Sequence, residues 1–223
     1  MDIPFHSDLA KQINKNVFET MYHGALEASM EIAKKEGSYS SFNGSPASQG
    51  ILQFDMWNVT PSNRYDWDSL KLNIKEHGLR NSLLLAPMPT ASTSQILGNN
   101  ECFEPFTSNI YVRRTIAGEF VCINKFLLKE LIDLGLWTDD IKNSIIRQGG
   151  SVQNIKGIPK GLQEKYKIVW EIPMKHLLEM SADRGAFICQ SQSTNLWMKE
   201  PTYKKLTAMH MFAWKKGLKT GIY

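Results

Sequence analysis

The segment 81–93 combines an apolar run with a cluster of hydroxyl side chains. Its sequence, NSLLLAPMPTAST, breaks at Pro87 and Pro89 and passes into Thr90-Ala91-Ser92-Thr93. We interpret it as a buried strand that leads into the start of a helix. Free backbone N–H groups at such a turn, together with three hydroxyls, suit the oxygens of a phosphate or diphosphate. An ordinary Ser/Thr helix cap is the alternative interpretation of the same residues.

The cysteine and histidine residues do not follow a metal-binding pattern. The three cysteines, at positions 102, 122 and 189, include no CxxC pair and have no histidine at ligand spacing. This predicts reduced thiols and no structural metal. The five histidines never form a pair across one helical turn with a carboxylate between them, which argues against a zinc-hydrolase site.

Composition and hydropathy indicate a soluble globular protein. Of the 223 residues, 42% are hydrophobic and 22% are charged, which is ordinary for that class. The longest apolar runs fall far short of the roughly 20 residues that span a bilayer. The first residues also lack the pattern of a signal peptide. We therefore expect a cytoplasmic protein without a membrane segment.

A basic segment, 202–219, lies near the end of the chain. It holds five lysines and no acidic residue, interleaved with Tyr203, Phe212 and Trp214. A solvated helix face is the simpler interpretation. The alternative is a non-enzymatic nucleic-acid-binding module, in which the lysines contact phosphates and the aromatic rings stack on bases. A salt titration separates the two, because phosphate-backbone binding weakens steeply with ionic strength.

Hydrophobic spacing and helix-stop residues predict a chain in which helices alternate with short strands. Helices are expected at 7–37, 66–78, 126–134, 139–146, 162–172, 174–184 and 203–216, the first with Ile13, Val17, Met21 and Ala25 at helical spacing. Strands are expected in the apolar run before Pro87 and at 110–114, 119–123 and 187–198, with a long connection at 38–61. This order favours an α/β fold with parallel strands, whose ligands bind at the carboxyl ends of the strands.

A longer pattern surrounds the hydroxyl cluster. Residues 67–89 read W-x2-L-x7-GLRN-x3-LA-x2-P, and QILGNNECFEPFTSNIYVRRTIAGEF follows. This combination resembles the large, catalytic subunit of class I ribonucleotide reductase, and the resemblance continues through RGAFICQSQSTN to the terminal WKKGLKTGIY. It implies an α/β fold that is part of the family's ten-stranded α/β barrel. Because those subunits are much longer, we expect residues 1–223 to be a single fragment from the later half-barrel, without the N-terminal regulatory domain and the first half-barrel.

The resemblance implies two groups of functional residues. In the family, a Pro-Thr-Ala-Ser-Thr loop binds the diphosphate of the ribonucleoside diphosphate substrate. This chain matches it without departure at Pro89, Thr90, Ala91, Ser92 and Thr93. The GLKTGIY ending resembles a family motif in which two adjacent tyrosines pass a radical to the active-site cysteine. Tyr223 matches the first of these tyrosines, and the second is not part of this sequence.

Cys102 lies in a misleading local match. Residues 100–104, NECFE, fit the Asn-x-Cys-x-Glu pattern around the family's radical cysteine. In the family, however, that motif lies upstream of the phosphate loop, whereas Cys102 follows it. We therefore interpret Cys102, like Cys122 and Cys189, as a small packing or surface residue. The radical cysteine, the reducing cysteine pair and the regulatory nucleotide sites are expected outside this chain.

The implied activity belongs to a larger assembly. A full subunit of this family reduces ribonucleoside diphosphates to 2′-deoxyribonucleoside diphosphates by a thiyl-radical mechanism. The resemblance implies a small subunit with a tyrosyl radical and di-iron centre, ATP and deoxynucleotide effectors, thioredoxin or glutaredoxin as reductant, and a homodimer of full subunits. Within this chain we expect no cofactor, and we expect the chain alone to be inactive.

Overall fold

The chain forms two compact units, each assembled from separate stretches of sequence. The computed structural model describes residues 3–220. The first unit, which we call the hairpin unit, contains residues up to Ala10 together with 90–176 and 195–201. The second, which we call the long-helix unit, contains 11–89, 177–194 and 202 onwards. Each unit therefore closes only through contacts between residues far apart in the sequence.

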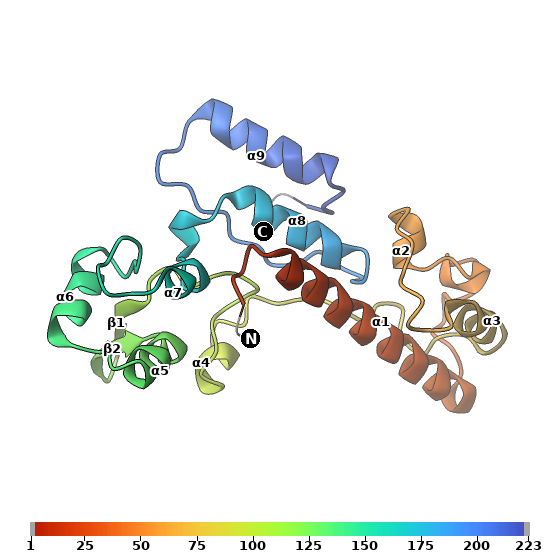
Figure 1. Cartoon of the computed structure of the whole chain (residues 1–223). Helices are drawn as coiled ribbons and strands as arrows, with labels where there is room; N and C mark the ends of the chain where they lie inside the picture. The colour runs from red at the N-terminus through yellow and green to blue at the C-terminus, as the bar shows by residue number, and fades with distance from the viewer. Residues whose placement is uncertain (1–2, 221–223) are drawn as a thin grey trace. The chain divides into compact units, whose positions relative to one another are not determined.

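Helix α1, Asp8–Glu36, is the longest element (Figure 1). The Ser7 hydroxyl caps it by accepting from the Ala10 N–H at 3.1 Å, and Gly37 ends it with a φ of +83°. These limits confirm the predicted helix. Its buried stripe differs from the expected one: Phe18, Tyr22, Leu26 and Met30 are buried, whereas Val17 and Met21 are 44% and 48% exposed. Two apolar stripes lie side by side on this helix, and the one with the larger aromatic side chains is buried.

The rest of the long-helix unit packs around that stripe. The predicted second helix is α3, Trp67–His77, with Asp66 as its N-cap and Gly78 at its end. Trp67, Leu70 and Ile74 from α3 join the same core as the α1 residues. The expected long connection at 38–61 contains two short helices, η1 (Ala47–Gln49) and α2 (Gln53–Met56). Phe54 of α2 is 1% exposed, so this connection contributes to the core.

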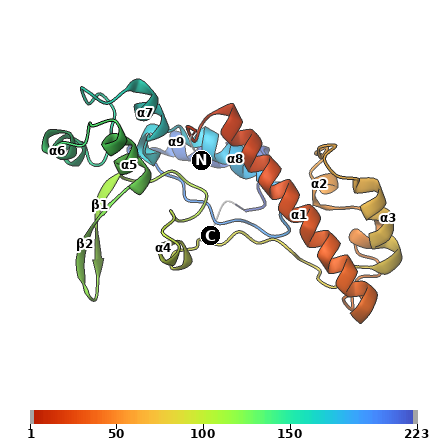
Figure 2. The ribbon, with the colours of Figure 1, turned by 60° about the horizontal axis from the view of Figure 1, so that its bottom comes forward.

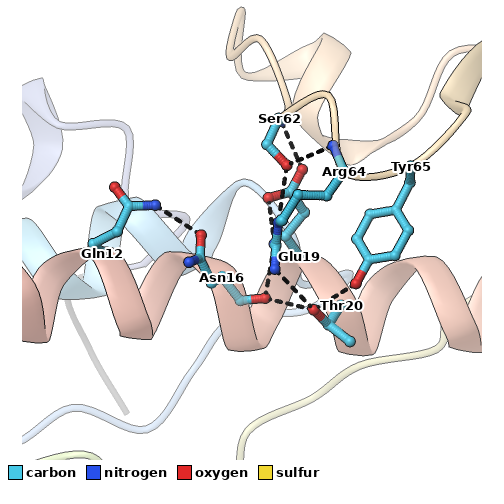
Figure 3. A network of polar contacts seen from close by, with 7 residues as sticks. All are labelled: Gln12, Asn16, Glu19, Thr20, Ser62, Arg64 and Tyr65. Carbon is cyan, nitrogen blue, oxygen red and sulfur yellow. Dashed lines mark hydrogen bonds and ion pairs between the residues drawn. The ribbon is translucent and has the colours of Figure 1, made fainter.

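A buried carboxylate attaches α1 to the loop before α3 (Figure 3). Glu19 is fully buried, and its Oε2 atom accepts from Arg64 at 2.8 Å while Oε1 accepts from the Ser62 N–H at 2.6 Å. Burial alone would raise the pKa of Glu19, but the hydrogen bonds from Arg64 and Ser62 outweigh it and hold the pKa below 4.5. Tyr65 adds a hydrogen bond to the Thr20 hydroxyl at 2.7 Å.

The hairpin unit takes its name from β1, Ile110–Thr115, and β2, Gly118–Ile123. They pair antiparallel with Ile110 opposite Ile123 (Figure 2). The unit also contains four α-helices and a 3-10 helix: α4 (Thr93–Ile96), α5 (Lys125–Asp133), α6 (Asp139–Arg147), α7 (Lys160–Lys165) and η2 (Val169–Glu171). The first residues of the next helix, α8 (Met174–Gly185), belong to it as well. Leu127, Leu131, Ile145 and Val152 form the centre of its core, each with 0% exposure. Here the predicted helix 162–172 is wrong, because α7 ends at Lys165 and only the short η2 follows.

Two predicted strands form no sheet. Among residues 3–220 the only ladder is the antiparallel hairpin, so the expected parallel sheet is not seen in this part of the chain. The run before Pro87 and the segment 187–198 are extended but irregular. They still contact each other: the Leu85 carbonyl accepts from Cys189 and the Pro87 carbonyl accepts from Ser193, at 3.1 and 3.2 Å. The acceptor moves from residue 85 to 87 while the donor moves from 189 to 193, so the two segments run in the same direction.

The last two helices complete the chain. Helix α8 is Met174–Gly185 and helix α9 is Tyr203–Lys215, close to their predicted bounds. The Thr202 side chain caps α9 by accepting from the Lys205 N–H at 3.2 Å. No helix among the described residues is long and apolar enough to cross a membrane.

Candidate functional site

The segment Pro89–Thr93 changes from extended chain to helix within a few residues. Thr90 has a φ of +58°, a left-handed conformation that is uncommon for a β-branched residue. Helix α4 then begins at Thr93, and its first bonds run from the Ser94 N–H to the Thr90 carbonyl and from the Gln95 N–H to the Ser92 carbonyl. The predicted strand end and helix start are thus an extended segment followed by a short helix.

Three consecutive backbone donors in this loop are available. Within residues 3–220, no group accepts a hydrogen bond from the N–H of Ala91, Ser92 or Thr93. All three residues are exposed. Helix α4 has only four residues, so its dipole contributes little, and the N–H groups themselves are the donors on offer. Neighbouring free N–H groups of this kind suit the oxygens of an anion.

The hydroxyl groups of the loop divide into two kinds. Ser92 occupies the N-cap position of α4, yet its side chain makes no capping hydrogen bond. Cap residues elsewhere in the chain do accept such bonds, namely Asp66, Asn124, Thr138 and Thr202. The helix-cap interpretation therefore does not describe Ser92, and its hydroxyl is available to a ligand. The Thr90 hydroxyl instead faces the protein, where Oγ1 accepts from the Cys102 N–H at 3.3 Å.

Ser94 is a polar residue that the sequence did not single out. It lies in α4, one position after the matched motif, and is 4% exposed. Its hydroxyl is buried without a hydrogen-bond partner among the described residues. Buried hydroxyls are normally hydrogen-bonded, so this one is unusual. In the sequence, only its position directly after the motif 89–93 could have marked Ser94 as a candidate site residue.

The structure places Cys102 directly beside the loop. Its N–H bonds Thr90, and its sulfur lies 3.7 Å from the Asn195 side-chain nitrogen. Asn195 in turn contacts Glu104 through its backbone N–H at 2.6 Å and its side-chain nitrogen at 3.2 Å. Sequence analysis did not find Glu104 or Asn195 as neighbours of the loop, because the two are separated by 91 residues. Cys122 and Cys189 are also free thiols of intermediate exposure.

The other predicted site residue, Tyr223, lies outside the described residues, which end at Thr220. The chain that leads towards it is well anchored. Gly217 follows α9 with a φ of +83°, and the Lys219 ammonium donates to the carbonyls of Ile188 and Cys189 at 2.7 and 3.0 Å and to the Gln53 side-chain oxygen at 3.0 Å. Burial of this ammonium lowers the pKa of Lys219.

Comparison with known proteins identifies the family. The model of the family described as "Ribonucleotide reductase, barrel domain" matches residues 1–223. The chain belongs to this family. Among curated proteins, the ribonucleoside-diphosphate reductase large chain of Neurospora crassa is 61% identical over 221 residues. The ribonucleoside-diphosphate reductase large subunit of Dictyostelium discoideum is 62% identical over 224 residues.

The ribonucleotide reductase relatives are much longer than this chain. The match covers 99% of the chain but 24% of the Neurospora protein, and 100% of the chain but 26% of the Dictyostelium protein. The chain thus spans about a quarter of the length of these relatives. Among solved structures, the alpha subunit of Actinobacillus ureae class Id ribonucleotide reductase matches 98% of the chain and 34% of its own length, with a TM-score of 0.73 and 30% identity.

The family match confirms the predicted fold class. The chain is a helix-rich part of the α/β barrel of ribonucleotide reductase large subunits. Among the described residues, no group of three histidine, cysteine or carboxylate side chains is placed to hold a metal ion. The hydroxyl-rich motif 89–93, with its free N–H groups at Ala91, Ser92 and Thr93, is the chemical feature on which the proposal below is built.

Proposed function

We propose that this chain supplies the substrate diphosphate loop and part of the radical-transfer path of a ribonucleoside-diphosphate reductase. The observation that supports the first role most directly is the run of free N–H groups at Ala91, Ser92 and Thr93, in a loop that matches the Pro-Thr-Ala-Ser-Thr motif. Three backbone donors and the free Ser92 hydroxyl can each bond a diphosphate oxygen. The loop's task is to hold the substrate so that its ribose meets the reacting groups.

The proposed reaction takes place in a larger assembly. A cysteine thiyl radical removes the 3′ hydrogen of the ribose, the 2′ hydroxyl leaves as water, and a cysteine pair supplies two electrons. Those cysteines come from the remainder of a large subunit, while the radical comes from a small subunit with a tyrosyl radical and di-iron centre. Thioredoxin or glutaredoxin restores the cysteine pair, and ATP and deoxynucleotides regulate a cytoplasmic homodimer of full subunits.

The nucleic-acid-binding alternative has less support. Of the five lysines in segment 202–219, Lys219 directs its ammonium at backbone carbonyls of the protein rather than at solvent. The family match gives no reason to expect a nucleic-acid interface. The lysines of α9, Lys204, Lys205 and Lys215, are exposed, which agrees with the simpler interpretation as a helix face in contact with solvent.

The diphosphate assignment is tested by two substitutions at Ser92 in a complete two-subunit reductase whose large subunit carries this sequence. Ser92→Pro removes one of the free donors and reshapes the turn, and should raise the substrate KM about tenfold, the cost of roughly one charge-assisted hydrogen bond. Ser92→Ala keeps the N–H and loses only the hydroxyl, so its increase should be smaller. An unchanged KM in both variants would contradict the assignment.

The proposed role of Tyr223 is tested by Tyr223→Phe in the same enzyme. Phenylalanine keeps the shape of tyrosine but lacks the hydroxyl proton whose loss accompanies oxidation. Turnover should therefore be abolished, while equilibrium binding of the substrate diphosphate stays close to normal because the loop is unchanged. Retained turnover would remove the radical-transfer role, and lost binding would indicate a structural role.

A further inference from the structure

The conformation of the diphosphate loop depends on a contact from outside it. Thr90 and Cys102 both have left-handed backbones, with φ of +58° and +54°. Neither residue adopts this conformation readily, so the surrounding structure has to hold it. The hydrogen bond from the Cys102 N–H to the Thr90 hydroxyl, 3.3 Å long, joins these two points directly. This hydrogen bond therefore links the turn at Cys102 to the first residue of the loop 90–93.

Glu104 connects the Cys102 turn to a distant segment of the hairpin unit. Its Oε1 atom accepts from the Asn195 N–H at 2.6 Å. Its Oε2 atom accepts from the Asn195 side-chain nitrogen at 3.2 Å and from the Trp197 indole nitrogen at 3.3 Å. The same Asn195 nitrogen lies 3.7 Å from the Cys102 sulfur. A continuous path of polar contacts thus runs from Glu104 through Asn195 and Cys102 to Thr90.

The far end of this path is attached to the body of the hairpin unit. The ring of Trp197 packs edge-on against Trp170, with ring centroids 5.2 Å apart. The backbone N–H of Trp197 donates to the Met174 sulfur at 3.2 Å. On the near side, the Asn100 side chain donates to the Glu104 carbonyl at 2.8 Å, which closes the turn around Cys102. Glu104 therefore lies between an anchored aromatic segment and the turn that contacts the loop.

The contacts of Glu104 suit a fixed acceptor rather than a proton carrier. All three donors are neutral groups, and among residues 3–220 no cationic side chain pairs with this carboxylate. A carboxylate with several N–H donors holds them more strongly than a neutral acceptor would, since the bonds are charge-assisted. Both oxygens accept hydrogen bonds in this way, so the carboxylate of Glu104 fixes the positions of Asn195 and Trp197.

We propose that Glu104 is a positioning residue that sets the conformation of the loop 90–93 through Asn195, Cys102 and Thr90. This inference rests on the proposed function of the loop as the diphosphate site. It predicts that loss of the Glu104 carboxylate loosens substrate binding without removing any group that contacts substrate. The chemical step is then affected less than binding.

The test measures kcat and KM for a ribonucleoside diphosphate in the complete two-subunit enzyme. Glu104→Ala should raise KM about tenfold with kcat nearly unchanged, the effect of roughly one lost charge-assisted hydrogen bond transmitted to the loop. Glu104→Gln keeps one acceptor oxygen and should give an intermediate KM. Glu119→Gln is the matched control, because Glu119 is an exposed carboxylate of the hairpin unit paired with Arg114 at 2.7 Å, and its KM should not change.

Hydrogen exchange provides a readout that does not depend on turnover. Amides of residues 90–102 should exchange faster in Glu104→Ala than in the parent enzyme, while those of α5 should not. If both kcat and KM stay at parent values and exchange is unchanged, the positioning role is wrong. If Ser92→Pro raises KM and Glu104→Ala does not, the loop assignment survives and only this inference fails. If neither raises KM, the diphosphate assignment itself fails.

Discussion

Glu19 in the long-helix unit and Glu104 in the hairpin unit are both carboxylates that join distant segments, but their surroundings differ. Glu19 is fully buried and meets the Arg64 guanidinium at 2.8 Å (Figure 3). Glu104 is only partly buried and receives three neutral N–H donors. The first therefore needs its counter-charge to remain buried, whereas the second depends on the direction of its donors.

This difference indicates a division of roles within one chain. Removing the partner of a buried charge mainly costs free energy of folding, because an uncompensated charge remains in the core. Removing donors from a partly exposed carboxylate such as Glu104 costs little stability, since water replaces them, but releases the segment that they orient. The long-helix unit thus uses its carboxylate to hold α1, and the hairpin unit uses its carboxylate next to the proposed substrate loop.

The largest expected effect on stability comes from Arg64→Met. The variant leaves the Glu19 carboxylate buried without its cation, and we expect a loss of about 3 kcal/mol, at the low end for buried pairs because the guanidinium is 36% exposed. Native-state hydrogen exchange of α1 amides measures it. Arg80→Met is the control, since Arg80 and Glu36 are an exposed pair at 3.5 Å and such pairs contribute at most about 1 kcal/mol. Equal losses in both variants would mean that the burial of Glu19 adds nothing to the energy of its pair with Arg64.

A smaller effect is expected from acid. The folded-state pKa of Glu19 is held below 4.5, so its contribution to stability is present above that pH and is lost as the pH falls through the folded-state value. Tryptophan fluorescence, to which the buried Trp67 contributes, should report this loss as the pH falls below 4.5. Glu19→Gln removes the titrating group and should flatten the pH dependence in that window. A variant with the parent's pH profile would mean that another carboxylate is responsible.

The smallest expected effect comes from Cys102→Ser. Serine keeps the backbone N–H that bonds Thr90, and its hydroxyl can accept from Asn195 in place of sulfur. Turnover of the complete enzyme should stay within about twofold of the parent value, because less than one hydrogen bond is exchanged. A loss of several orders of magnitude with folding preserved would mean that Cys102 reacts, and that the Asn-x-Cys-x-Glu match has chemical meaning.

Local signals predicted the helices well. Ser7 and Gly37 bracket α1, and Gly78 ends α3, because caps and left-handed stops act within a few residues. The buried side of α1 was harder, since Val17 and Met21 compete with Phe18 and Tyr22 for the core. Only the packing of the whole unit decides between neighbouring apolar stripes.

Non-local features were not predictable in the same way. The run before Pro87 and segment 187–198 have strand-like sequences, but a ladder requires partners that the local sequence does not specify. The loop 89–93 was predicted from its motif, and its helix start at Thr93 is observed. The contact between Glu104 and Asn195 near this loop was missed, because 91 residues separate two side chains that carry no pattern of their own.

The discontinuity of the two units also determines the order in which the chain can fold during synthesis. The Asn14 side chain of α1 donates to the Met180 carbonyl, 166 residues later. At about 5 to 20 residues per second, this partner emerges roughly ten to thirty seconds after α1. The hairpin unit likewise waits for residues 195–201 before Glu104 meets its donors. Until then Ala186, Phe187 and Ile188 are missing from the core that α1 shares with α3, so this core stays incomplete in the nascent chain.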